Sequence, residues 1–345
     1  MISEGRNLIE MGKTLLVCFI VSIGFVSCKS KDKSYSAFQG YAQGSTFRIV
    51  YEPVSDVDFI NPVDSILAVI DHSMSLWDST SLIRLVNEHS GPHVLDDHFV
   101  KVLNRSRHFY ELSQGAFDPS LSPLIEAWGF AREKRTQFPA QSQVDSLLNL
   151  VGLEKFCLTG DTLVKMAPNS ELNFNAIAQG YTVDVLGDFL ESHGILNYLV
   201  ELGGETKAKG LNRSGVKWKV GIERPDFNIG SENNALQTVV SLSDGSLVTS
   251  GSYRKFIEKD GKKYSHTLNP KTGKPVTHSL LSVAVVVSNA MDADAYATFF
   301  MVIGKDLAMK YAEKHSMAIQ CTFEEAGKME IVHSTAFEAL IVEQL

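Results

Sequence analysis

The sequence has 345 residues, of which 44% are hydrophobic and 21% are charged, and its formal net charge is −8 at pH 7. These proportions are ordinary for a globular protein, and a chain of this length can bury a large core as one big domain or as two halves. The acidic balance and the lack of a long basic run argue against a nucleic-acid-binding surface.

The first 28 residues are predicted to be a targeting segment rather than part of the fold. Residues 15–26 are apolar but too few to span a bilayer as a stable helix, and they lead through Ser27 to Cys28. This pattern resembles a bacterial lipoprotein signal, with cleavage before Cys28, a lipid on its sulfur, residues 29–36 as a polar tether and residues 37–345 as the folded domain. We therefore expect a membrane-anchored lipoprotein that faces the periplasm; a plain secretory signal with an incidental cysteine is the alternative.

Two of the four cysteines remain in the folded part, Cys157 and Cys321. They either pair in an oxidising compartment or stay buried and reduced, and the sequence leaves both open. No Cys-x-x-Cys motif or mixed His and Cys cluster predicts zinc.

The first half of the folded part alternates short strands with amphipathic helices. Residues 38–51 predict a strand, a glycine turn and a second strand. Residues 61–77 predict a helix with Asn61 as its cap and Pro62 in the first turn. Further helices are expected at 81–88, 99–113 and 141–151, and a hairpin at 156–166.

The second half begins with a helix that runs to His193 and continues mainly as strands. Strands are expected at 200–205, 218–223, 236–243, 246–249 and 282–287, with a turn at 249–254 and a hairpin through residues 260–261. From Ala290 the pattern becomes helical and ends at Gly304. Because the strands mostly follow one another as hairpins, the predicted fold class is α+β with largely antiparallel sheets and packed helices.

Two carboxylates stand out for their chemistry. Asp294 and Thr298 lie four residues apart on the last of these helices, so both side chains share one face and offer the hard oxygen donors that Mg²⁺ prefers. The alternative is that Asp292 and Asp294 only complement the helix dipole. Asp118 precedes a proline, which holds its backbone extended and suits presenting the carboxylate to a pocket; a simple Asp-Pro turn is the alternative.

Taken in order, these segments resemble the ApbE-like flavin transferases, the family of FAD:protein FMN transferases. The matching stretches cover about residues 36–320, nearly the whole folded part. They lie at 44–46, 75–87, 115–119, 173–184, 202–204, 218–225, 249–253, 266–273 and 294–298.

The resemblance implies an ApbE/T-fold-like single large domain of two subdomains and an activity. Members of the family transfer FMN from FAD, as substrate, to a threonine hydroxyl of a target flavoprotein, release AMP and require Mg²⁺. The resemblance places Mg²⁺ on the Ala176 carbonyl and the side chains of Asp294 and Thr298, with Asp292 as a further ligand or a neighbour of one. It makes His266 and Asp118 the candidates for catalysis.

The resemblance also implies a set of residues that contact FAD. These are Gln43, Trp77, Ala116, Phe117, Asp118, Asn173, Gln179 and His266. The chain departs from the family pattern at Asn173 and Gln179, where an aspartate and a lysine are common, so one negative and one positive charge are lost together. Gln43 also stands where the family usually has methionine.

Two other functions remain open at this point. The same site using water as the nucleophile would be a hydrolase that splits FAD into FMN and AMP. A flavin-binding lipoprotein without turnover is the third reading, and the presence of Asp294, Thr298, His266 and Asp118 argues against it.

Overall fold

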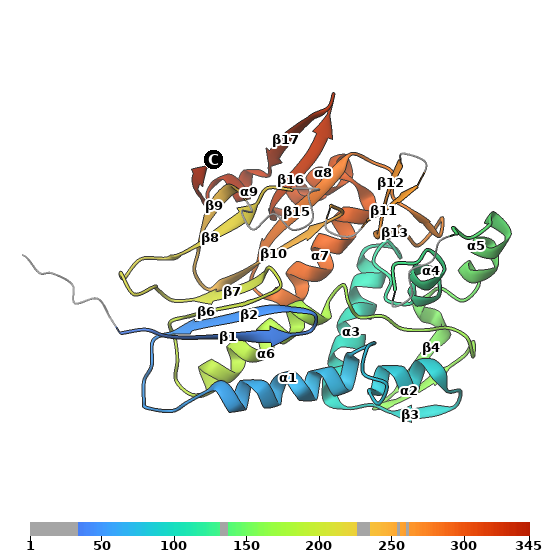
Figure 1. Ribbon diagram of the computed structural model, residues 1–345, viewed down its shortest axis with the longest axis horizontal. Helices are drawn as coiled ribbons and strands as arrows, with labels where there is room; N and C mark the ends of the chain where they lie inside the picture. The colour runs from blue at the N-terminus through green and yellow to red at the C-terminus, as the bar shows by residue number, and fades with distance from the viewer. Residues whose placement is uncertain (1–33, 132–136, 226–234, 254–255, 260–261) are drawn as a thin grey trace, which may run out of the picture. The chain divides into compact units, whose positions relative to one another are not determined.

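An antiparallel sheet of eight strands dominates the computed structural model, which describes residues 34–131, 137–225, 235–253, 256–259 and 262–345 (Figure 1). Every neighbouring pair in this sheet is antiparallel, as the hairpin pattern predicts. In spatial order its strands are β1 (Ser36–Ala42), β2 (Ser45–Tyr51), β6 (Tyr198–Leu202), β7 (Glu205–Lys209), β10 (Gly245–Gly251), β15 (Leu280–Val287), β16 (Ala318–Glu325) and β17 (Lys328–His333).

Both faces of the sheet are buried around β10 and β15, because their side chains alternate between two apolar clusters. Val248, Val283 and Val285 point into the larger cluster, where helices α6 (Ala178–Ser192) and α7 (Ala290–Ile303) pack on the sheet. Leu247 and Ala284 point into the smaller cluster. The members from outside the sheet come from β8 (Trp218–Glu223), β9 (Leu236–Leu242) and α9 (Thr335–Glu338), and β18 (Ile341–Gln344) pairs with β9.

Helix α7 is buried on nearly all sides, unlike an ordinary surface helix. Figure 1 shows it beside β10 and β15, and it also contacts α6, α3 (Asp97–Leu112) and α8 (Lys305–His315). Its start at Ala290 and its end before Gly304, which has φ 81°, are as predicted. A polar side chain on this helix therefore has little access to water.

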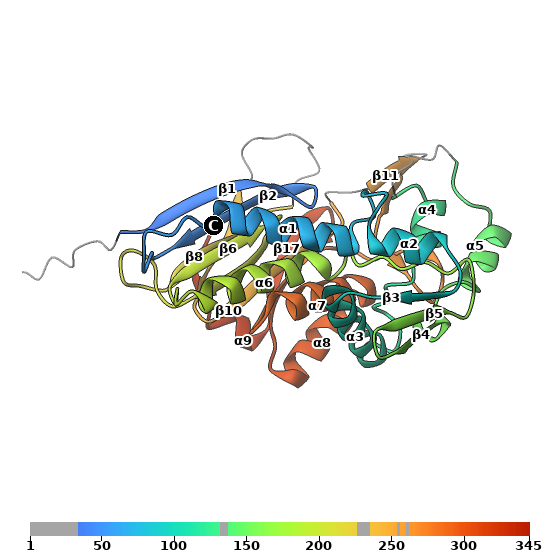
Figure 2. The same cartoon turned by 90° about the horizontal axis from the view of Figure 1, so that it is seen from below.

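Helix α1 (Ile60–Met74) lies beside α6 (Figure 2) but begins differently from the prediction. Phe59 is the cap residue and Asn61 lies within the first turn, so the predicted Asn61 cap is wrong. The reason is tertiary: Phe59 is buried and packs edge to face on Tyr51 and Phe189, which fixes where the chain enters the helix. The next helix, α2 (Leu82–Glu88), begins as predicted, with Ser81 as its cap.

A third apolar cluster joins segments that are far apart in sequence. It contains Leu124, Val144 and Leu268, and the Trp128 indole N–H donates to the Gly273 carbonyl oxygen at 2.8 Å. The elements around it are α4 (Ser122–Ala127), α5 (Gln141–Leu148) and the hairpin of β13 (Leu268–Asn269) and β14 (Lys274–Pro275). The other short elements are β3 (Pro92–Val94), β4 (Phe156–Thr159), β5 (Thr162–Lys165), β11 (Phe256–Lys259), β12 (Lys262–Ser265) and a 3₁₀ turn, Leu153–Lys155.

Strand β10 and the two cysteines of the folded part differ from what the sequence pattern predicts or leaves open. Residues 249–251 belong to strand β10 instead of a turn, because they pair with β15. Cys157 is exposed, Cys321 is buried, and both are free thiols. The proposed signal and tether up to residue 33, and residues 260–261 of the predicted hairpin, lie outside the described residues. Within the described part, no helix has both the length and the apolar character to cross a membrane.

Candidate functional site

The candidate site forms where the first turn of α6 crosses the start of α7. A Cβ atom on Gly180 would lie 2.3 Å from the Ala290 carbonyl oxygen and 2.9 Å from the Asp294 Cβ atom, so only glycine allows this approach. The Gly180 N–H donates to Asp294 Oδ2 at 3.2 Å. The carboxylate of Asp294 is thus placed at the N-terminus of α6, where the positive end of the helix dipole attracts negative charge.

Asp294 is a buried carboxylate without a cationic partner in the described part of the chain. Its residue exposure is 4%, and no lysine, arginine or histidine side chain there forms an ion pair with it. Burial raises the pKa of Asp294 from 3.8 to about 7, and the hydrogen bond from Gly180 only partly opposes this rise. A buried charge is costly unless it is paired or coordinates a metal ion, so this position favours a cation.

Thr298 and Ala176 are the other two donors predicted for Mg²⁺. Thr298 follows one helical turn later and is half-buried, and Ala176 lies in the turn that precedes α6. The described residues contain no cluster of three His, Cys, Asp or Glu side chains that could hold a metal ion. A site of one carboxylate, one hydroxyl and one carbonyl leaves coordination positions for phosphate oxygens and water, which Mg²⁺ retains in nucleotide sites.

Asp292 does not join this donor set. Two residues along a helix correspond to about 200°, so Asp292 and Asp294 lie on opposite faces of α7. Asp292 accepts two hydrogen bonds from the Arg105 guanidinium, at 2.6 and 2.5 Å, and one from the Asn289 side-chain amide at 3.0 Å. Its charge is therefore already paired with a cation, which argues against a role as a further metal ligand and favours the other expected role, a neighbour of a ligand.

Two glycine turns of the sheet meet the first turns of α6. Gln43 has φ 51° in the β1–β2 turn and donates from Nε2 to Thr182 Oγ1 at 2.9 Å. Gln179 Nε2 lies beside Gly203 of the β6–β7 turn, 3.0 Å from where a Cβ atom would stand, and Ser45 Oγ lies at 3.2 Å from the same point. The structure thus brings Gln43 and Gln179 to the end of α6 that also holds Asp294.

The Gln43 side chain has spare hydrogen-bonding capacity there. Its Oε1 atom is buried and has no hydrogen-bond partner in the described part of the chain. A buried amide oxygen without a donor is costly. It is therefore suited to accept a hydrogen bond from a bound molecule.

Asn173 and the Asp118 segment are adjacent although 55 residues separate them in the sequence. The Asn173 N–H donates to the Pro119 carbonyl oxygen at 2.7 Å, and Asn173 Oδ1 accepts from the Asn175 N–H at 2.9 Å. Burial raises the pKa of Asp118 to about 6, although Ser120 donates to it from both its N–H, at 2.8 Å, and its hydroxyl, at 2.5 Å. Asp118 is ionised at pH 7 but holds a proton more readily than an exposed aspartate.

The other predicted FAD contacts differ in what they can offer. The Phe117 side chain is 1% exposed and packs on Phe109 in the core, so a contact with FAD has to come from its backbone, and Ala116 is also buried. Trp77 follows α1 and is 64% exposed, which leaves its ring free to stack. His266 follows β12, and its ring meets that of Phe130 edge to face with the centroids 6.4 Å apart.

Asn87 is a supporting residue to which the sequence analysis gives no role. Its side-chain amide donates to the Leu172 carbonyl oxygen at 2.8 Å and accepts from the Leu172 N–H at 2.7 Å. It therefore holds the segment that carries Asn173 in the way a neighbouring strand would. Its signal in the sequence is only its place within the 75–87 stretch of the resemblance.

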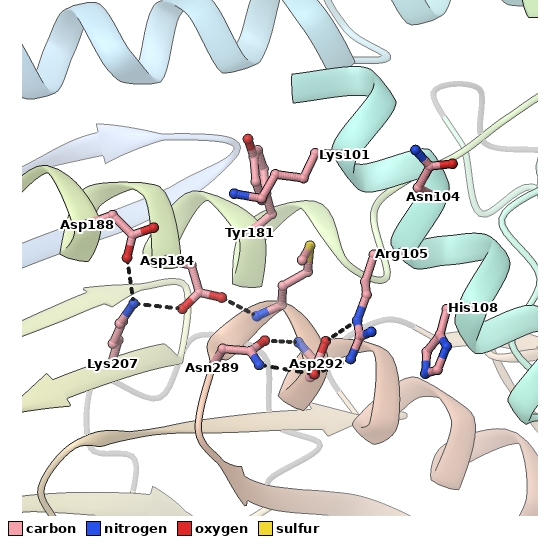
Figure 3. Close-up of a pocket in the computed structure, with 11 residues that line it drawn as sticks. Lys101, Asn104, Arg105, His108, Tyr181, Asp184, Asp188, Lys207, Asn289 and Asp292 are labelled. Carbon is pink, nitrogen blue, oxygen red and sulfur yellow. Dashed lines mark hydrogen bonds and ion pairs between the residues drawn. The ribbon is translucent and has the colours of Figure 1, made fainter. Parts of the chain in front are cut away.

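A separate open pocket of about 620 Å³ lies on the other face of α7 (Figure 3). Its walls carry Lys101 and Arg105 of α3, Asp184 of α6, Lys207 of β7 and Asp292 of α7. Of the residues predicted to bind metal, Asp292 alone lines it, and none of the predicted FAD or catalytic residues does. We assign the candidate site to the Asp294 face, because that face brings together residues from α6, α7 and the two glycine turns.

Comparison with known structures places the fold among the flavin transferases. The flavin transferase ApbE of Vibrio cholerae superposes with a TM-score of 0.80 at 30% identity, over 89% of this chain and 99% of that chain. The apo form of the Pseudomonas stutzeri flavinyl transferase ApbE gives a TM-score of 0.81 at 30% identity, over 90% of this chain and 98% of that one.

The sequence comparisons identify the family. The model of the ApbE family matches residues 43–323, and the chain belongs to this family. The FAD:protein FMN transferase of Vibrio cholerae is 33% identical over 287 residues, which cover 81% of this chain and 85% of that protein. The Escherichia coli protein with the same name is 27% identical over 352 residues, covering 97% and 99%. The recognised resemblance and the antiparallel α+β fold are therefore confirmed.

Proposed function

We propose that the protein transfers FMN from FAD to a threonine hydroxyl of a target flavoprotein, releases AMP, and uses Mg²⁺. The observation that carries the proposal is the buried Asp294 carboxylate at the N-terminus of α6, which forms no ion pair among the described residues, in a chain that belongs to the ApbE family. FAD and a flavoprotein acceptor are the substrates that the names of the relatives imply.

In this reaction the threonine oxygen attacks the phosphorus of the FMN half of FAD. A new phosphorus–oxygen bond forms, the pyrophosphate bond to the AMP half breaks, and the proton of the hydroxyl leaves with a base. Bound at Asp294, Thr298 and Ala176, Mg²⁺ would supply charge neutralisation for the pyrophosphate. Such a transfer depends on alignment and on neutralising charge rather than on a covalent intermediate with the enzyme.

The residues of the chain then have distinct roles. The N-terminus of α6 offers phosphate oxygens the positive end of the helix dipole, and Trp77 offers an exposed ring for stacking. His266 and Asp118 are the candidate groups that accept the threonine proton. The raised pKa of Asp118, about 6, suits this task because the group is ionised at pH 7 yet basic enough to take a proton.

The test uses the purified protein with FAD, Mg²⁺ and an acceptor flavoprotein domain, beside the same domain with its threonine changed to valine. Intact mass spectrometry should show a mass gain equal to FMN on the first domain only, with AMP released in equal amount. Release of AMP without an acceptor would instead identify a hydrolase. If neither flavinylated acceptor nor AMP forms, flavin binding is the only activity that remains. A His266→Ala variant with the wild-type rate would remove that residue from the mechanism.

We also propose that the mature protein is a lipoprotein anchored at Cys28 and facing the periplasm. The proposal rests on the apolar run, the small residue before Cys28 and the polar tether after it. In cells that express the full chain, wild type should fractionate with membranes and Cys28→Ala should appear in the soluble extract. Continued membrane retention of the variant would contradict a lipid anchor at this residue.

A further inference from the structure

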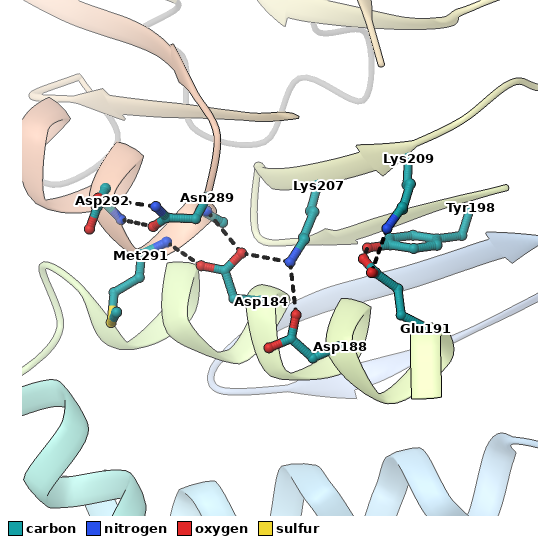
Figure 4. A network of polar contacts seen from close by, with 10 residues as sticks. Asp184, Asp188, Glu191, Tyr198, Lys207, Lys209, Asn289, Met291 and Asp292 are labelled. Carbon is teal, nitrogen blue, oxygen red and sulfur yellow. Dashed lines mark hydrogen bonds and ion pairs between the residues drawn. The ribbon is translucent and has the colours of Figure 1, made fainter. Parts of the chain in front are cut away.

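The crossing of α6 and α7 is fixed by a second carboxylate, Asp184 (Figure 4), and this residue lies one turn after Gly180 on α6. Asp184 Oδ1 accepts from the Ala290 N–H at 3.0 Å, and Oδ2 accepts from the Met291 N–H at 2.9 Å. Both donors belong to the first turn of α7, whose N–H groups have no partner within the helix. Asp184 therefore binds the N-terminal end of α7, the helix that carries Asp294.

The two helices hold each other reciprocally. Asp184 of α6 accepts from the first amides of α7, while Asp294 of α7 accepts from the Gly180 amide in the first turn of α6. Both backbone polar groups of Ala290 contact α6. Its N–H donates a hydrogen bond to Asp184, and its carbonyl oxygen packs against Gly180. Asp294 follows Ala290 by four residues, or about 6 Å along the helix axis.

These contacts are not needed to start α7, because the helix has its own cap. Asn289 Oδ1 accepts from the Asp292 N–H at 2.8 Å, which is the usual side-chain cap. Asp184 adds contacts between the helices instead, and these fix where α7 sits against α6. Its contribution is therefore to the position of Asp294 and not to the existence of the helix.

The charge of Asp184 is supported by a lysine on the sheet. Lys207 Nζ lies 3.2 Å from Asp184 Oδ1 and 3.2 Å from Asp188 Oδ1, so one ammonium serves two carboxylates. Asp184 is buried, which raises the pKa of its carboxyl, and Lys207 and the two amides oppose that rise. Asp188 is exposed and its carboxylate is one turn further from α7.

We propose that Asp184 is a positioning residue for the metal ligand Asp294, acting through the first two amides of α7. The inference rests on the proposed function, because it takes Asp294 as the ligand of a divalent cation. Groups that orient a metal ligand commonly change metal affinity by 10- to 100-fold when they are removed. We expect Asp184→Asn to weaken divalent-cation binding about tenfold, since an amide accepts from only one of the two N–H groups.

The test measures Mn²⁺ binding to the purified full-length protein by electron paramagnetic resonance, with no FAD or acceptor present. Asp184→Asn should raise the dissociation constant for Mn²⁺ about tenfold. Asp188→Asn is the matched control, because it loses a contact with the same lysine but none with α7, and it should stay within about twofold of wild type. In the transferase assay, raising the metal concentration should restore most of the rate of Asp184→Asn, since all three donors remain.

The outcomes separate the inference from the proposed function. Wild-type protein that binds no Mn²⁺ would contradict the metal site itself. Wild type and Asp184→Asn with equal Mn²⁺ affinity would overturn the positioning role and leave the metal site intact. If Asp184→Asn does not fold, Asp184→Glu keeps the charge but displaces the carboxylate by one methylene, and unchanged affinity in that variant would also overturn the inference.

Discussion

Replacing Asp294 with asparagine should make the metal-free protein more stable while it abolishes turnover. The carboxylate is buried, and burial raises its pKa from 3.8 to about 7. That difference corresponds to roughly 4 kcal/mol, which is the cost of keeping the charge ionised inside the folded protein above pH 7. Asparagine removes the charge but can still accept the hydrogen bond from Gly180.

The sign of the pH dependence follows from the raised pKa. The folded protein binds the Asp294 proton more tightly than the unfolded chain, so this group adds stability at low pH. That contribution is lost as the pH rises from about 4 to about 7. Without metal, Asp294→Asn should therefore exceed wild type by up to about 4 kcal/mol at pH 8 and by much less at pH 5.

Urea unfolding in EDTA at pH 5 and pH 8 measures both differences, and adding Mg²⁺ completes the experiment. Mg²⁺ should stabilise wild type, because a ligand that binds only the folded state adds free energy of unfolding, and should leave Asp294→Asn unchanged. Asp188→Asn, at an exposed carboxylate, should show neither effect. An Asp294→Asn variant that is less stable than wild type at pH 8 without metal would refute the reasoning.

Three further changes test the supports of the site. Asn87→Ala should lower the free energy of unfolding by about 1–3 kcal/mol and raise the KM for FAD, because the backbone N–H and C=O of Leu172 both lose their partner. Urea unfolding and steady-state kinetics measure the two effects. Gly180→Ala should cost about 1–3 kcal/mol and most of the activity, because its Cβ atom meets backbone of α7. Ser120→Ala should move the acid limb of the kcat/KM profile, expected near pH 6 from Asp118, to higher pH, because the carboxylate loses a hydroxyl donor.

Each of these has a variant or result that can contradict it. Gly187→Ala is the control for the glycine, because the three atoms nearest to its Cβ atom would belong to the side chains of Tyr198 and Lys207 and not to the backbone of α7, and it should retain most of the activity. An unchanged KM in Asn87→Ala would show that the peptide it holds does not shape the FAD site. If the acid limb of the kcat/KM profile of Ser120→Ala lies at the same pH as in wild type, then ionisation of Asp118 does not cause that limb.

The sequence predicts what local pattern controls. The β-branched run at 282–287 is strand β15, and the helix from Ala290 to Gly304 has the expected ends, because periodicity and turn residues act over a few positions. The start of α1 is mispredicted because Phe59 is held by rings from β2 and α6. Such a contact has no local signal.

The site is predicted only in part for the same reason. The spacing of Asp294 and Thr298 indicates one face of one helix, and the resemblance supplies the other residues. The partner of Asp292 lies 187 residues away, and the amides held by Asp184 lie 106 and 107 residues away. Only the folded chain shows that Asp292 is neutralised while Asp294, two residues later, forms no ion pair with any residue that the structure describes.

The most direct test of the account is the anomalous scattering of Mn²⁺ in crystals of the protein grown with AMP. A metal site at Asp294 predicts one strong peak within about 2.5 Å of an Asp294 carboxylate oxygen, with the Thr298 hydroxyl and the Ala176 carbonyl oxygen as the other protein ligands. No peak at Asp294, or a peak beside Asp292 and Asp184 in the opposite pocket, would contradict it.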